Sequence, residues 1–269
     1  MTHISPETQT ALMEAANALA DAARAATLKH FGAPGLSADN KDDAGFDPVT
    51  AADREAEQAM RAVLAEMRPD DAIVGEEYGS QPGTSGLTWV LDPVDGTRAF
   101  VAGAPTWGVL IAVGDAGGPR LGVIDQPYIG ERFLGGFGQA FVAGPHGRRD
   151  LATRPPRPLS EAILLTTFPE VGSAEEGRAF HDLAAQVRLT RYGLDCYAYG
   201  LVAAGQIDLV VEAGLQPYDI QGPMAVVEAA GGIVTDWRGG PAQEGGRVIA
   251  AANGEIHAAA LEILSRAPA

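Results

Sequence analysis

The segment Asp92–Thr97 (DPVDGT) places two carboxylates three residues apart, between an apolar run at 89–91 and residues 98–100, which can open a helix. Such a junction of strand end and helix start is where α/β proteins place ligands. The proline favours an extended first aspartate, so the two carboxylates can converge while the Val94 carbonyl stays out of the strand ladder. Oxygen donors suit a hard divalent cation. Taken alone, however, this pattern is most often only a β-turn.

The backbone that follows the second aspartate is suited to an anion. Gly96 has no Cβ and permits close approach of a ligand to the backbone. The amides of Gly96 and Thr97 lie at a predicted helix start, where a phosphate group is favoured. The segment therefore predicts a cation and a phosphate side by side.

Four more acids stand at strand ends or helix starts. Glu76 and Glu77 follow an apolar run, Asp47 precedes a capped helix, and Asp219 opens a helix. Each has an ordinary explanation: a polar loop, a turn, or an acid that interacts with the helix dipole. Together, in a chain without a CxxC motif or a His pair at ligand spacing, they indicate Mg²⁺ or Mn²⁺ rather than Zn²⁺.

Regular elements are expected on both sides of these acids. Ser5-Pro6 starts a helix that should end near 31–32, and Thr50 with Asp53 forms a capping box for a second helix, which Pro69 stops. Apolar runs then predict strands, and after residue 158 strand-like and helix-like pieces alternate, as in α/β proteins. The predicted strands of the first half are 72–75, 89–91, 107–113, 121–124 and 133–135.

The proline-rich stretch at 154–158 is the one candidate domain boundary. It predicts an N-terminal half, 1–150, that carries most of the metal ligands and a C-terminal half, 151–269, with Asp219 and the substrate-selecting residues. A long surface loop within one continuous domain explains the stretch equally well.

Composition excludes several classes of protein. The 269 residues include 35 Asp+Glu against 19 Lys+Arg, a net charge of -16. This charge disfavours nucleic acid and anionic membrane as partners.

Cys196 is the only cysteine, so no intramolecular disulfide can form, and we expect it to serve packing. The N-terminus lacks the pattern of an export signal and no apolar run is long enough to span a membrane, so a cytoplasmic location is expected.

In their order along the chain, four motifs resemble those of the inositol monophosphatase-like phosphatases, a superfamily that includes fructose-1,6-bisphosphatases. The resemblance covers nearly the whole chain. It implies an α/β fold with alternating αβαβα layers and Mg²⁺-dependent hydrolysis of a small phosphomonoester. The motifs are DPVTAAD at 47–53, GEE at 75–77, WVLDPVDGT at 89–97, and Tyr218-Asp219 ahead of AAGG at 229–232.

The resemblance also assigns roles to individual residues. It implies two or three Mg²⁺ per site, with Mn²⁺ as an alternative, and a homodimer. The metal ligands would be Glu76, Asp92, Asp95, Asp219 and the Val94 carbonyl, with Glu77 just behind them. Asp47 and Thr97 would orient the attacking water, and the Gly96 and Thr97 amides would hold the phosphate.

Substrate choice should depend on the second half of the chain. Inositol monophosphatases usually have a small residue where this chain has Asp195, and in them the acid matching Glu212 bonds a ring hydroxyl. The additional acid makes the chain more similar to the histidinol-phosphate phosphatases of the same superfamily, because Asp195 and Glu212 could pair with a substrate ammonium group. Asp195 could also serve as a helix N-cap. Arg191 would contact phosphate from a neighbouring subunit or pair with a local acid.

Two other functions remain open at this point. A broader inositol-1-phosphate phosphatase is the nearest alternative, and a noncatalytic scaffold of the same fold is the second. The intact metal positions give no support to the scaffold. A nucleotidase or bisphosphatase is disfavoured because no basic cluster near the motifs would neutralise a second phosphate.

Overall fold

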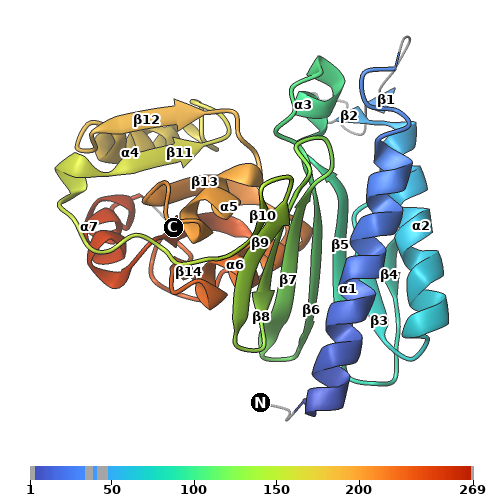
Figure 1. Ribbon diagram of the computed structural model, residues 1–269. Helices are drawn as coiled ribbons and strands as arrows, with labels where there is room; N and C mark the ends of the chain where they lie inside the picture. The colour runs from blue at the N-terminus through green and yellow to red at the C-terminus, as the bar shows by residue number, and fades with distance from the viewer. Residues whose placement is uncertain (1–3, 34–38, 41–47, 268–269) are drawn as a thin grey trace.

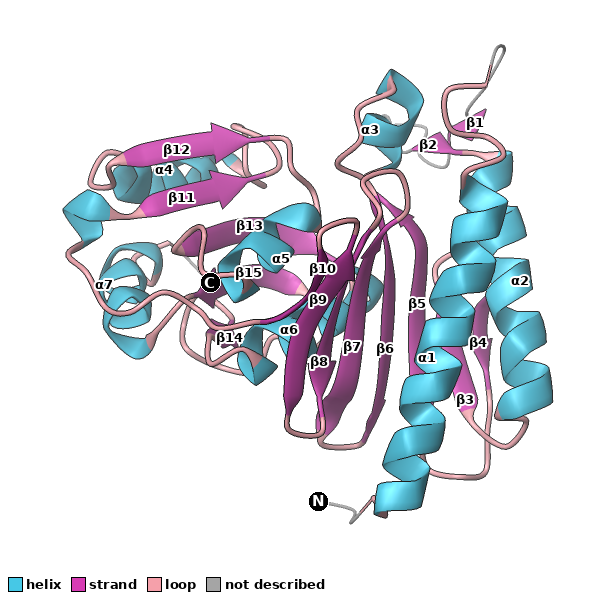
Figure 2. Cartoon of the chain, in the orientation of Figure 1, coloured by secondary structure: helices cyan, strands magenta, loops and turns pink. Residues whose placement is uncertain are grey.

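The computed structural model describes residues 4–33, 39–40 and 48–267. The chain folds into five layers, in which helices and two β-sheets alternate (Figures 1 and 2). This is the αβαβα arrangement that the family resemblance implies.

Two long helices form the first layer. Helix α1 (Pro6–Thr27) starts at Ser5, whose hydroxyl accepts the Thr8 N–H, and α2 (Ala51–Met67) starts at the predicted capping box of Thr50 and Asp53. Their apolar stripes pack on each other and on one face of the first sheet. Helix α1 ends at Thr27, four residues before the predicted end, and a short run of turns follows.

The first sheet has eight strands in the order β10-β9-β8-β7-β6-β5-β3-β4. All neighbours are antiparallel except β3 and β5, which are parallel. The strands are β3 (Ala72–Gly75), β4 (Gly79–Gln81), β5 (Thr88–Asp95), β6 (Gly108–Asp115), β7 (Gly118–Gln126), β8 (Glu131–Gly136), β9 (Gln139–Gly144) and β10 (Gly147–Asp150). Residues 39–40 (β1) and 48–49 (β2) form a separate two-stranded pair.

The second sheet has five strands in the order β12-β11-β13-β15-β14. Here β11 runs parallel to β12 and β13, whereas β15 is antiparallel to both of its neighbours. The strands are β11 (Ile163–Thr166), β12 (Leu189–Tyr192), β13 (Leu209–Leu215), β14 (Ile233–Thr235) and β15 (Gly246–Ala251). Helices α4 (Ala174–Ala184) and α7 (Gly254–Leu264) cover its outer face.

Helices α5 (Tyr197–Ala203) and α6 (Pro217–Ala229) form the layer between the two sheets. Helix α6 lies so close to the first sheet that a Cβ on Gly135 would stand 2.5 Å from the Val226 Cα. One apolar cluster joins α5, α6 and the facing sides of both sheets. The two halves of the chain therefore share a core.

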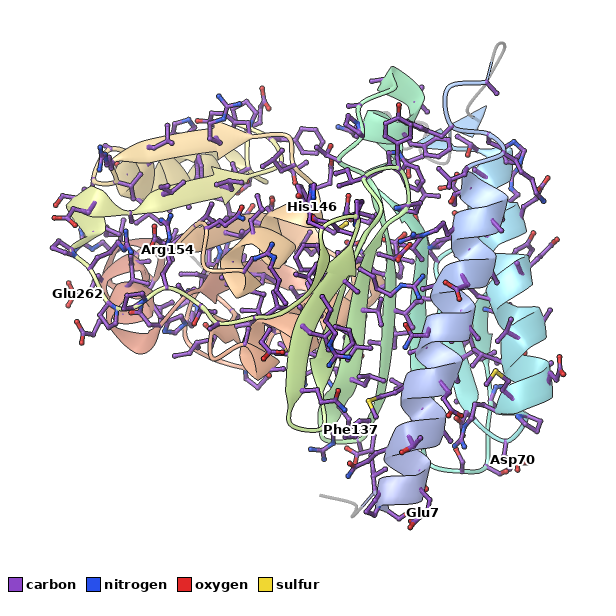
Figure 3. All side chains as sticks on the ribbon, in the orientation of Figure 1. Glu7, Asp70, Phe137, His146, Arg154 and Glu262 are labelled. Carbon is purple, nitrogen blue, oxygen red and sulfur yellow. The ribbon has the colours of Figure 1, made fainter. Side chains whose placement is uncertain are left out.

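The proline-rich stretch runs along the surface between the sheets and is held to the second half. Arg154, which is labelled in Figure 3, donates to the Gly205 carbonyl at 2.8 Å and pairs with the fully buried Asp208 at 2.9 Å. Arg157 pairs with the same carboxylate at 3.1 Å. Within the described residues, no helix has the length and apolarity that crossing a membrane requires.

Candidate functional site

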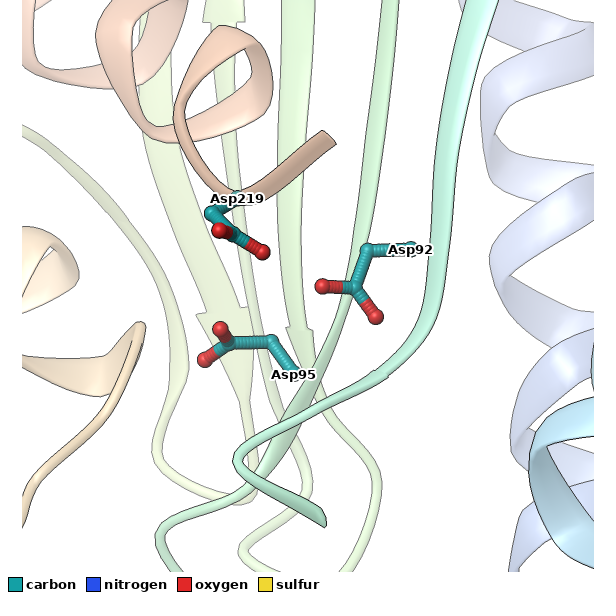
Figure 4. A group of neighbouring side chains, drawn as sticks. All are labelled: Asp92, Asp95 and Asp219. Carbon is teal, nitrogen blue, oxygen red and sulfur yellow. The ribbon is translucent and has the colours of Figure 1, made fainter. Parts of the chain in front are cut away.

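Three aspartates meet where the first sheet faces α6. Asp92 and Asp95 are at the end of β5, and Asp219 is in the first turn of α6 (Figure 4). One oxygen of each lies within 4.8 Å of one oxygen of each of the others. Asp219 is at least 124 residues away from the two aspartates of β5 in sequence, yet the fold brings all three to one point.

An irregularity in β5 makes this convergence possible. Asp92 pairs with Leu110 and Asp95 with Gly108, so the two residues between the aspartates have no partner of their own on β6. The bulge turns both carboxylates the same way. The Asp92 Oδ1 atom accepts the Val94 N–H at 3.0 Å, and the Val94 carbonyl lies outside the ladder, as predicted.

The other two aspartates are held by backbone donors. The Cys196 N–H donates to Asp95 Oδ2 at 2.7 Å, which ties the end of β5 to the start of α5. The Gln216 N–H donates to Asp219 Oδ2 at 2.6 Å in a capping box, and Pro217 opens the helix. Their orientation is therefore set before any ligand binds.

The electrostatics of the cluster favour a bound cation. Burial first, and then neighbouring carboxylates, raise the pKa of Asp92 well above its usual range, and the same causes raise the pKa of Asp95. The neighbour that contributes most to the shift of Asp92 is Glu76. A group of hard oxygen donors whose charges repel one another at this distance fits a divalent cation such as Mg²⁺, which would offset the repulsion.

Glu76 and Glu77 differ in position. Glu76 lines the same cavity as the three aspartates, but it is not one of the three acids whose oxygens meet. Glu77 does not line the cavity, and its N–H donates to Glu57 Oε2 at 2.6 Å. Glu57 is fully buried on α2 and also accepts the Tyr78 N–H, so it fixes the turn that carries both glutamates.

Gly96 and Thr97 begin α3 (Thr97–Ala102) directly after the aspartates. Gly96 has φ 81°, and a Cβ there would stand 2.7 Å from Asp195 Cγ, so both backbone shape and space require glycine. The Thr97 hydroxyl donates to the Val94 carbonyl at 3.0 Å and lies 3.4 Å from Asp53 Oδ1. Asp47, the predicted partner of Thr97, lies outside the described residues.

A cavity of about 420 Å³ opens above these groups. Its floor is the acidic cluster, and its wall comes from the C-terminal half of the chain. The lining residues are Glu76, Asp92, Val94, Asp95, Gly96, Thr97, Arg98, Thr167, Phe168, Asp195, Glu212, Ala213, Gly214, Leu215, Gln216, Tyr218 and Asp219.

Asp195 and Glu212 both belong to this wall. Asp195 has φ 47°, its Oδ2 atom accepts the Thr106 hydroxyl at 3.0 Å, and burial raises its pKa. Its side chain does not cap α5, because Cys196 is the N-cap residue. Glu212 on β13 accepts the Thr167 N–H at 2.7 Å and the Thr166 hydroxyl at 3.0 Å, and burial raises its pKa to about 7.

Arg191 lies apart from the other predicted residues. It is exposed on the edge strand β12 and does not line the cavity. Its predicted role toward substrate phosphate from a neighbouring subunit stays a prediction.

Sequence reasoning missed four supporting residues. Glu57, Thr106, Thr166 and Thr167 hold the acidic side chains or the turn that carries them. Only Glu57 is marked in the sequence, because it is an acid on the mostly apolar buried face of α2. The other three pair with acids 45 to 89 residues away, and no local pattern marks such pairs.

Comparisons with known proteins agree with this geometry. A chloroplastic bifunctional phosphatase of Arabidopsis thaliana, IMPL2, is 41% identical over 259 residues, which are 92% of this chain and 73% of that protein. A histidinol-phosphatase of Mycobacterium tuberculosis is 36% identical over 255 residues, covering 93% of this chain and 95% of the relative.

A solved structure of an inositol monophosphatase from Zymomonas mobilis superposes with a TM-score of 0.84 at 40% identity, covering 97% of this chain and 99% of that one. The profile of the inositol monophosphatase family matches residues 8–269. With the acidic cluster, the fold and these matches in agreement, the chain belongs to the inositol monophosphatase family of Mg²⁺-dependent phosphomonoesterases.

Proposed function

We propose that this protein is a histidinol-phosphate phosphatase, which hydrolyses L-histidinol phosphate to L-histidinol and phosphate. One observation carries the proposal: two acids, Asp195 and Glu212, line the same cavity as the three aspartates that we propose as metal ligands. A substrate with an ammonium group near its phosphate ester could pair with both acids and would offset one of their two charges. A polyol such as inositol has no cation and would leave both acids without a counterion.

Different residues would have different roles in hydrolysis. Glu76, Asp92, Asp95, Asp219 and the Val94 carbonyl would hold two or three Mg²⁺ ions, or Mn²⁺ in their place. Such cations polarise a phosphoryl group and make water a stronger nucleophile. The Gly96 and Thr97 amides would orient the phosphate, and the Thr97 hydroxyl with Asp47 would orient the water for attack in line with the ester bond. The leaving alcohol takes up the proton that the water loses.

Named relatives support the same substrate. Histidinol-phosphatases of Mycobacterium tuberculosis and of Streptomyces coelicolor are 36% and 37% identical to this chain. As a small-molecule phosphatase, the protein would need no nucleic acid or membrane partner, and we infer a cytoplasmic homodimer.

Inositol 1-phosphate is the second candidate substrate, because the Zymomonas mobilis structure at 40% identity is described as an inositol monophosphatase. Glu212 could accept a ring hydroxyl instead of an ammonium group. The two candidates therefore differ in what Asp195 does.

Phosphate release from both esters, measured side by side with Mg²⁺ and with EDTA, tests the proposal. We expect Mg²⁺-dependent release with kcat/KM for L-histidinol phosphate at least about tenfold higher, as a charge-assisted pair predicts. A preference for inositol 1-phosphate would keep the mechanism and refute the substrate. Absence of metal-dependent release from either ester would refute both and favour a noncatalytic scaffold.

A further inference from the structure

An aromatic side chain stands at the rim of the acidic cavity. Phe168 follows the end of β11, lines the cavity and is 43% exposed. Most other lining residues are acidic, small or hydroxyl-bearing. Because it belongs to the lining of the cavity, this large apolar ring offers a surface that a substrate can cover.

One contact of the ring and two hydrogen bonds of its chain neighbour relate Phe168 to the rest of the site. Its chain neighbour Thr167 donates both its N–H and its hydroxyl to Glu212, at 2.7 and 2.9 Å. The Arg98 guanidinium lies 4.8 Å from the ring centre, and Arg98 directly follows Thr97. Phe168 is therefore tied on one side to the acid of the cavity wall and on the other to the predicted phosphate-binding turn.

The chemistry of the proposed substrate matches this order of groups. A phosphate held at Gly96 and Thr97 and an ammonium group between Asp195 and Glu212 would bring the third part of the molecule, a planar heterocycle, to the cavity rim. Flat rings gain from offset or edge-to-face contact with a phenyl ring. An inositol ring is puckered and covered with hydroxyl groups, so it gains less from the same surface.

We infer that Phe168 is a specificity-determining residue, which binds the planar heterocycle of the substrate against its exposed ring surface. The inference rests on the proposed function, because it requires an aromatic aminoalkyl phosphate as substrate. It assigns to Phe168 a part in substrate binding and none in the chemical step.

The test compares two esters that differ only in the ring. L-Histidinol phosphate is assayed beside the phosphate ester of L-alaninol, which keeps the ammonium group and the ester but has no ring. In Phe168→Ala we expect KM for histidinol phosphate to rise about fivefold, as the loss of an aromatic contact predicts, with kcat retained. KM for the alaninol ester should change less than about twofold, since the contact is absent there. Phe168→Tyr should restore the wild-type KM.

Tyr192→Ala is the matched control, because Tyr192 is 42% exposed in the same half of the chain but does not line the cavity. Equal changes in KM for both esters in Phe168→Ala, or failure of Phe168→Tyr to restore binding, would overturn the inference. Failure of the proposed function is seen separately, in the wild-type enzyme. If the wild type prefers inositol 1-phosphate to histidinol phosphate, both the proposed function and the inference about Phe168 are wrong.

Discussion

The floor and the wall of the cavity are built in different ways. On the floor, Asp92 and Asp95 are three residues apart in one bulged strand, and backbone N–H groups hold each of them. On the wall, Asp195 and Glu212 depend on hydroxyl donors that are 89 and 46 residues away in sequence. The β5 part of the floor is thus marked by a local motif, although the N–H that holds Asp95 comes from Cys196, 101 residues away, whereas both acids of the wall are held by donors from remote segments. We infer that the floor performs the chemistry, which is common to the family, and that the wall selects the substrate.

The largest effect should follow from a change to the floor. Asp92→Asn keeps the shape of the side chain but removes a charge from the metal cluster, so we expect kcat/KM to fall about 10³-fold for every ester tested. Equilibrium titration with Mg²⁺ should show weaker binding. The matched control is Asp182→Asn on the exposed face of α4, which should leave both quantities unchanged. Retained activity in Asp92→Asn would exclude the cluster as the metal site.

The second-largest effect should be on the pH dependence of the free energy of unfolding, through Glu212 in the wall. Burial raises the pKa of Glu212 from 4.5 to about 7. The folded protein therefore binds this proton more tightly than the unfolded chain does. The resulting stabilisation is complete below pH 4.5 and is lost as pH rises through 7, a change of about 3 kcal/mol.

Glu212→Gln should remove this pH dependence. The free energy of unfolding, measured in EDTA by urea titration at pH 5 and pH 8, should fall less with rising pH in the variant than in the wild type. If the free energy of unfolding changed equally with pH in Glu212→Gln and in the wild type, the Glu212 carboxyl group would titrate normally, and the wall would not hold it in a desolvated state.

A third change tests the support of the floor. Glu57 pairs with Arg61 at 2.7 Å and accepts the N–H groups of Glu77 and Tyr78. Glu57→Gln replaces this buried charged acceptor by a neutral, weaker one. The variant should therefore have a free energy of unfolding lower by about 2 kcal/mol and a reduced Mg²⁺ affinity. The control Glu175→Gln breaks an exposed pair with Arg178 and should change stability by less than about 0.5 kcal/mol. Unaltered stability in Glu57→Gln would contradict the supporting role.

The smallest effect should come from the support of the wall. Thr106→Val removes the hydroxyl that donates to Asp195, so KM for histidinol phosphate should rise about threefold while kcat is retained. Thr10→Val on the exposed face of α1 is the control. A fall in kcat rather than a rise in KM would show that Thr106 affects the chemical step, and would contradict the distinction between a catalytic floor and a substrate-selecting wall.

The difference between floor and wall also explains which parts of the site could be predicted from the sequence. The acids of the floor lie at strand ends and helix starts beside recognisable motifs, and the structure brings Asp92, Asp95 and Asp219 together, whereas their role as metal ligands stays a prediction. The layered fold was predicted correctly as well. By contrast, Phe168 and Thr106 carry no local signal, because their partners come from remote segments.

Edge strands were also missed, for a related reason. Strands β4 and β10 are exposed along their whole length, so no apolar run marks them. Strand β12 is mostly exposed, and it carries Arg191. The division of the chain near residue 150, the homodimer and the role of Arg191 stay predictions.

The most direct test of the account is the ratio of kcat/KM for L-histidinol phosphate to kcat/KM for inositol 1-phosphate in the wild type, Asp92→Asn and Asp195→Asn. The account predicts that Asp92→Asn lowers both values and keeps their ratio, because the floor acts on any phosphomonoester. Asp195→Asn should lower the ratio about tenfold, through the loss of a charge-assisted hydrogen bond to the ammonium group. A ratio unchanged in Asp195→Asn, or altered as strongly in Asp92→Asn, would contradict the separation of chemistry from selection.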